Sequence, residues 1–158
     1  MHTFTDNNSR VWTLSVNVAT IKRVRALCGV DLAQIADFTE YDVTDSLLHK
    51  LSVDPVLLVD VLYAVCKPEA EAKNVTDENF GAAIMGDVIV SAINALLEEM
   101  VDFFPGSKRK ILHQLLVLSR RFDKEIEQEI QNVLNETNAE ADMSLLKNSS
   151  TNVPESAE

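Results

Sequence analysis

The side chains best suited to holding a metal ion in this sequence are three histidines and two cysteines. His2, His49 and His113 are far apart along the chain, and no HExxH or HxH pattern joins them. Cys28 and Cys66 show no CxxC spacing, and each lies within an apolar pattern of helical period. We therefore expect no metal site, and two buried thiols in a reducing compartment.

Carboxylates are the remaining candidates for acid–base chemistry. Asp54 with Asp60, or Glu98 with Glu99, could form an acid and its base. Helix caps and solvated helix faces account for the same four residues without catalysis. The sequence also lacks a GxSxG elbow and a phosphate-binding glycine loop, and it has four glycines in all. We expect no catalytic residues, no cofactor and a protein that is not an enzyme.

The overall charge narrows the classes of partner. The 158 residues carry a formal net charge of -11, which opposes binding to the phosphate backbone of nucleic acids. The apolar stretch from Val56 to Cys66 contains Asp60 and is shorter than the roughly 20 residues that cross a bilayer. The amino-terminal residues lack the apolar run of a signal peptide. We expect a cytoplasmic protein that binds neither nucleic acid nor membrane.

The first part of the chain predicts a β-hairpin followed by a helix. Trp12, Leu14 and Val16 alternate with polar residues, and residues 6–9 are typical of a turn. A lone hairpin is marginal in water, so its apolar face should lie on helices. A helical period then runs from residue 18 to 28 and stops at Gly29. Residues 30–43 fit either a helix or an extended segment.

The middle of the chain predicts several helices. Asp54 caps a buried central helix with proline in its first position, and Pro68 with the polar run 69–74 should end that helix or lead it into solvent. Thr76 caps a short helix, and a longer one runs from residue 88 to the proline and glycine at 105 and 106. The expected fold class is mainly α, a compact bundle of about five helices with a short N-terminal β-hairpin.

The last predicted helix starts near Ser107 and carries an apolar stripe that is longer than the rest of the core. Such a stripe either pairs with another helix or belongs to an edge helix of the protein's own bundle. The predicted domain spans residues 1–135, and residues 136–158 are predicted to be a disordered acidic tail. The candidate partner-binding residues, which the second interpretation assigns mostly to the core, are Ile111, Leu115, Leu118, Phe122 and Ile126.

Between about Phe4 and Phe122, a series of short segments follows a characteristic order along the chain. The segments are Phe4–Asp6, Arg10–Leu14, Ile21–Val24, Gly29–Leu32, Asp54–Leu58, Tyr63, Lys67–Pro68, Thr76–Phe80 and Phe103–Pro105. This order resembles small tail assembly chaperones of long-tailed bacteriophages and prophages. Ser9 stands where such a hairpin would have glycine.

The resemblance implies a protein that binds the tape-measure protein and keeps it soluble until tail-tube subunits replace it. It implies a location in the cytoplasm of the bacterial host and absence from the mature virion. The expected partners are the tape-measure protein, the tail-tube protein and a second copy of the chain. The alternative is a structural or adaptor protein of the tail or connector that is retained in the particle.

Overall fold

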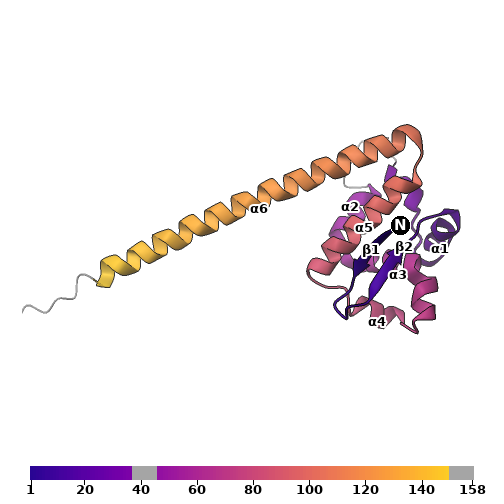
Figure 1. Cartoon of the computed structure of the whole chain (residues 1–158), viewed down its shortest axis with the longest axis horizontal. Helices are drawn as coiled ribbons and strands as arrows, with labels where there is room; N and C mark the ends of the chain where they lie inside the picture. Colours follow the sequence, from indigo (N-terminus) through magenta and orange to yellow (C-terminus); the bar gives the residue numbers. More distant parts are fainter. Residues whose placement is uncertain (37–45, 150–158) are drawn as a thin grey trace, which may run out of the picture. The chain divides into compact units, whose positions relative to one another are not determined.

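The computed structural model describes residues 1–36 and 46–149. The chain divides into two units, with the boundary between Gln114 and Leu115. The described part is mainly helical with an N-terminal antiparallel hairpin, so the predicted fold class is confirmed (Figure 1). Its elements are β1 (His2–Thr5), β2 (Val11–Leu14), α1 (Val18–Cys28), the 3-10 helix η1 (Leu32–Ala36), α2 (Leu47–Val53), α3 (Pro55–Ala72), α4 (Asp77–Gly81), α5 (Asp87–Phe103) and α6 (Gly106–Ser149).

The hairpin presents one apolar face to the helices, as its alternating pattern predicts. Its register pairs Phe4 with Trp12, and both side chains are buried together with Leu14. Phe80 of α4 meets the Trp12 ring edge-on, with the ring centroids 4.8 Å apart. Helical packing therefore supplies the burial that two strands lack by themselves.

The hairpin turn is organised around the buried carboxylate of Asp6. This carboxylate accepts hydrogen bonds from the main-chain N–H groups of Asn8 and Arg10 and from the Nε atom of Arg10. The indole N–H of Trp12 donates to it over 2.8 Å. Ser9 has a φ of 60°, in the left-handed region that glycine adopts at least cost, so the turn geometry is the one for which glycine was expected.

Both edges of the hairpin are covered by helices of the first unit. β1 packs against α5, and β2 packs against α3. On the β2 edge, Glu69 accepts a hydrogen bond from the N–H of Thr13, and Lys73 donates to the carbonyl of Val11. The exposed N–H and C=O groups of an edge strand pair readily with other chains, and these contacts remove some of them.

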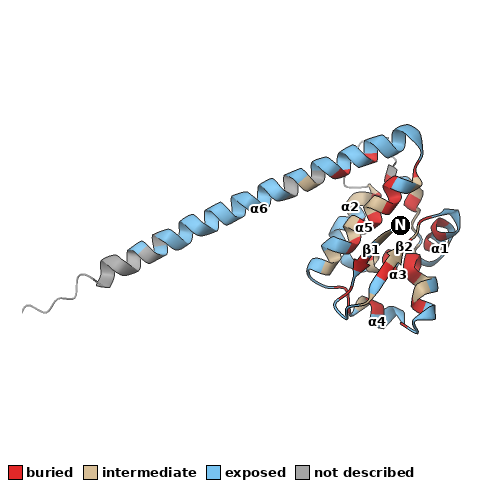
Figure 2. Ribbon diagram, in the orientation of Figure 1, coloured by how far each residue is buried: buried red, intermediate tan, exposed pale blue. Residues whose placement is uncertain are grey.

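The central helix begins at the predicted cap and ends within the predicted polar run. Asp54 caps α3 by accepting from two main-chain N–H groups, and Pro55 occupies the first turn. α3 is buried along much of its length (Figure 2) and contacts α1, α2, α4 and α5. The helix continues through Pro68 and ends at Ala72, inside the polar run 69–74 that was predicted to end it or lead it into solvent.

A side chain from another helix compensates for this proline. Pro68 has no N–H group to bond the carbonyl of Ala64, four residues earlier. The Nε atom of Arg23 in α1 donates to that carbonyl over 2.6 Å, and its Nη2 atom donates to the carbonyl of Val65 over 3.1 Å. Arg23 thus satisfies the Ala64 carbonyl that the proline leaves unpaired, and it adds a second bond to the neighbouring carbonyl of Val65.

The last helix is longer than predicted. α6 continues to Ser149, whereas the sequence boundary was placed at residue 135. The residues after 135 include Ala, Glu, Leu, Met and Lys, which have high helix propensity, and they contain no glycine or proline before residue 154. Polar composition was therefore a poor sign of a helix end here. Of the predicted acidic tail, residues 150–158 lie outside the described residues.

The structure also bears on the ambiguous segment 30–43 and on membrane crossing. Leu32–Ala36 form the 3-10 helix η1, which settles the first part of the ambiguous segment 30–43 as helical. Residues 37–45 lie outside the described residues, and the choice between helix and strand there stays open. Among the helices described, none combines the length and apolar character that a bilayer crossing requires.

Candidate functional site

The start of α6 is fixed by the end of α5. Phe104 is extended, as the residue before a proline tends to be, and Gly106 has a φ of 61°. Arg109 then donates to the carbonyls of Val101, Asp102 and Phe104, which lie beyond the last intrahelical bonds of α5. α6 therefore begins with a basic side chain bonded to the carboxyl end of the preceding helix.

The five predicted partner-binding residues all lie on α6 at spacings of three or four residues. Ile111 belongs to the first unit and is 44% exposed, while its neighbour Leu112 is buried. Leu115 and Leu118 belong to the second unit and are 41% and 45% exposed. The side chain of Phe122 lies outside the described residues. The interpretation of these residues as plain core does not fit the exposure of Ile111, Leu115 and Leu118.

Ile126, one of the five predicted binding residues, begins a more exposed surface whose other residues were not among the five. We call Ile126, Ile130, Val133 and Leu134 the distal stripe; their exposures are 57%, 53%, 53% and 50%. Their spacings of four, three and one residues place them on one side of a helix. In the described part of the second unit, α6 has no other element on which to bury them. The signal was present in the sequence, as the continuation of the apolar period beyond Ile126.

The distal stripe lies in a purely acidic stretch. Every residue from 125 to 139 is exposed, and the charged residues among them are Glu125, Glu127, Glu129 and Glu136. About 100° separates successive residues of an α-helix, so Glu127 and Glu129 flank Ile126 and Ile130 on opposite sides. The nearest basic residue, Lys124, lies away from Ile126, on the outer side of Glu127, with which it lines a shallow hollow. The surface is apolar along its centre and negative along both margins.

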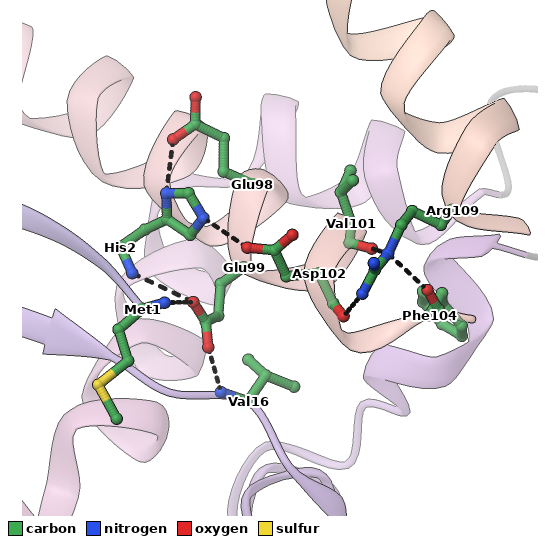
Figure 3. Close-up of polar contacts among 9 residues, drawn as sticks. All are labelled: Met1, His2, Val16, Glu98, Glu99, Val101, Asp102, Phe104 and Arg109. Carbon is green, nitrogen blue, oxygen red and sulfur yellow. Dashed lines mark hydrogen bonds and ion pairs between the residues drawn. The ribbon is translucent and has the colours of Figure 1, made fainter. Parts of the chain in front are cut away.

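A second cluster of chemically active groups joins β1 to α5 (Figure 3). The imidazole of His2 lies 2.9 Å from the carboxylate of Glu98 and 3.0 Å from that of Asp102. The hydrogen bond with His2 holds the pKa of the Asp102 carboxyl below its usual range, against the smaller opposing effect of burial. The ligand atoms of His2, Glu99 and Asp102 lie within 4.8 Å of one another.

Glu99 shows what this cluster does in the fold. It was expected on a solvated helix face, but it is buried and accepts from the main-chain N–H groups of His2 and Val16. The Glu99 carboxylate is therefore hydrogen-bonded although it is removed from water. The cluster therefore anchors the hairpin to α5. The expected absence of a metal site stays a prediction, because three potential ligands do meet here.

An open hollow of about 290 Å³ lies beside α1 and α3, and its walls include Thr13, Asn17, Arg23, Cys66 and Glu69. Its two charged side chains already bond the main chain, Arg23 to the carbonyls of α3 and Glu69 to the N–H of Thr13. Both charged side chains therefore have a structural role. Among the described residues that line the hollow, no set of catalytic groups is arranged together.

The two cysteines differ in their surroundings. Cys66 is buried as predicted, and burial raises the pKa of its thiol to about 12. Cys28 is the last residue of α1 and is only partly buried, so the prediction of two buried thiols is wrong for Cys28. A thiol with so high a pKa is almost never ionised near neutral pH, which makes Cys66 a poor nucleophile.

Comparison of the chain with protein-family models, with curated proteins and with solved structures gave no match.

Proposed function

We propose that this protein is a tail assembly chaperone of a long-tailed bacteriophage or prophage. It binds the tape-measure protein and keeps it soluble in the bacterial cytoplasm during tail morphogenesis, and it is absent from the finished particle. The order of segments between Phe4 and Phe122 supports this proposal through its resemblance to such chaperones. The observation that carries the proposal is the distal stripe, an exposed apolar surface on a helix that has no partner among the described residues of its own unit.

The physical argument rests on the cost of leaving this surface in water. Burying an isoleucine or leucine side chain gains roughly 1.5–3 kcal/mol, so four half-exposed residues offer a partner a substantial gain. A helix without tertiary contacts is marginal in water, so packing against a second helix would also stabilise α6 itself. A long helical client with its own apolar stripe suits such a surface, since helices recognise one another through residues at these spacings.

The test is co-expression with the candidate tape-measure protein, followed by measurement of the soluble fraction of that client. The intact chain should keep the client soluble. Replacing Ile126 and Ile130 together by aspartate should return most of the client to the insoluble fraction, because two charges then lie in the middle of the apolar surface.

The matched control replaces Gln128 and Asn132 by aspartate, which adds the same charge to the opposite face of the helix. This control should leave the client soluble. Equal loss with both double variants, or no loss with either, would rule out the distal stripe as the client surface. Finding the protein in purified virions would favour the structural or adaptor alternative.

A further inference from the structure

We propose that the distal stripe selects a basic amphipathic helix, one with lysine or arginine on both sides of its apolar residues. This inference rests on the proposed helix-binding function and names the class of partner. Glu127 and Glu129 are exposed on opposite sides of the stripe, and Glu136 lies beside Val133. Residues 125–139 include no basic residue, and the one basic neighbour of these glutamates, Lys124, lies three residues before Glu127 on its side away from the stripe.

Charge complementarity favours such a partner for two physical reasons. Lysine and arginine have apolar stems that cover the edge of a stripe while their charges reach the glutamates at its margin. Opposite charges across an interface also steer the encounter and exclude like-charged partners. An acidic helix with the same apolar residues would bring glutamates against glutamates.

A second copy of the chain is a poorer occupant of this surface. Residues 125–139 hold four glutamates and no basic residue, so overlapping two such segments brings like charges together in either direction. Only an offset pairing with residues 108–124 of the other copy would meet basic side chains, and Arg109 there already bonds carbonyls of α5. The chain as a whole also repels its copies at a net charge of -11. The favoured occupant is therefore a different protein.

The experiment uses the full chain and two labelled synthetic peptides, with binding followed by fluorescence anisotropy. Both peptides carry leucines at helical spacing; one has lysine at the flanking positions and the other has glutamate there. The lysine peptide should bind at least about tenfold more tightly than the glutamate peptide at low salt. Raising the NaCl concentration from 50 to 300 mM should reduce that difference, since exposed charges are screened.

Two double variants that change the net charge equally test whether the glutamates beside the stripe cause the preference for the lysine peptide. Glu127→Gln with Glu129→Gln removes two negative charges from the flanks and should weaken binding of the lysine peptide about five- to tenfold. Gln128→Lys with Asn135→Lys adds two positive charges to the opposite face, at positions that are not three or four residues from Glu127, Glu129 or Glu136, and should change that affinity less than about twofold. Circular dichroism of both variants should match that of the parent chain.

Equal affinity for the two peptides, or equal weakening by the two double variants, overturns the inference. So does the absence of measurable binding by either peptide. Self-association that competes with the lysine peptide and is lost in the Ile126→Asp, Ile130→Asp variant overturns it in favour of a second copy. If co-expression still shows client solubility lost in that variant, the proposed function survives and the charge selection alone is wrong.

Discussion

Asp6 is a buried carboxylate that the fold keeps ionised. Burial raises its pKa, but the hydrogen bonds from Trp12 and Arg10 and the charge of Arg10 together hold that pKa below its usual range. The side chain of Asp6 is fully buried, whereas that of Arg10 is partly exposed. A buried charge with this many donors stabilises the turn only while it remains charged.

Replacing Asp6 by asparagine should lower the free energy of unfolding by about 2–3 kcal/mol at pH 7, because a charged acceptor for several donors is lost. A group with a depressed folded pKa stabilises the protein above its unfolded pKa of about 3.9 and loses that effect as the pH falls through the folded value. The difference between parent and variant in urea unfolding should therefore shrink below about pH 4.

Asp60→Asn is the control, because the pKa of Asp60 is shifted in the opposite direction from that of Asp6. Burial and the charges of Asp77 and Asp54 raise the pKa of Asp60, so removing its charge should not destabilise the chain at pH 7. An Asp6→Asn variant as stable as the Asp60→Asn variant would contradict the role assigned to Asp6.

The two thiols should react at different rates. Because the Cys66 thiol is buried and has a pKa of about 12, iodoacetamide at pH 8 should leave it unmodified in the folded chain. Cys28 is partly exposed and should be alkylated first, although burial also raises its pKa. Peptide mass spectrometry should find modification at Cys28 under native conditions and at both residues in urea. Rapid native labelling of Cys66 would mean that α3 opens locally.

At the scale of elements, Arg23 and Pro68 should behave as a coupled pair although they lie on different helices. Arg23→Met removes the guanidinium and keeps much of the stem, and it should cost about 1–2 kcal/mol because carbonyls of α3 lose their donors. In a Pro68→Ala background the restored N–H can bond the carbonyl of Ala64, so the same change should cost less. Urea unfolding of the four proteins gives the coupling energy, expected near 1 kcal/mol.

The control for this double-mutant cycle is Arg25→Met. Arg25 also lies on α1, but it pairs with Asp31 at the surface. Its cost should be under about 1 kcal/mol and should be the same with proline or alanine at position 68. Coupling of Pro68 to both arginines would indicate a general effect of the substitution on α3.

Local sequence signals were sufficient to predict most helices and strands, but they could not predict the contacts between these elements. The caps at Asn17, Asp54 and Thr76 were readable because each side chain bonds N–H groups only two or three residues away. The passage of α3 through Pro68 depends on Arg23, more than forty residues earlier, which no local pattern reveals. The burial of Glu99 similarly depends on the hairpin that it bonds.

At the scale of the whole molecule, the sequence predicted an overlong helix and misplaced its end. The period of the stripe was readable as far as Val133, and the structure adds Leu134 beside it. Of the five predicted binding residues only Ile126 lies in the more exposed part of α6, and the other exposed residues, Ile130, Val133 and Leu134, follow it. Periodicity identifies the apolar side of a helix, but which part of that side is covered depends on elements distant in sequence.

The division into two units leads to the last prediction, which separates stability from binding. A chain ending at Lys124 loses the distal stripe, yet every residue from 125 to 139 is exposed and contributes little burial to folding. Its melting temperature should stay within about 2 °C of the full chain, a change of less than about 1 kcal/mol for a domain of this size. A chain ending at Asn138 should be equally stable and keeps the stripe.

The two truncated chains should differ in function alone. The chain ending at Asn138 should keep the tape-measure client soluble, and the chain ending at Lys124 should not, because only the former retains Ile126, Ile130, Val133 and Leu134. A fall of more than about 5 °C on cutting at Lys124 would show that the distal helix stabilises the remainder. Loss of client solubility in both chains would place the binding surface after residue 138, and retention in both would place it before residue 125.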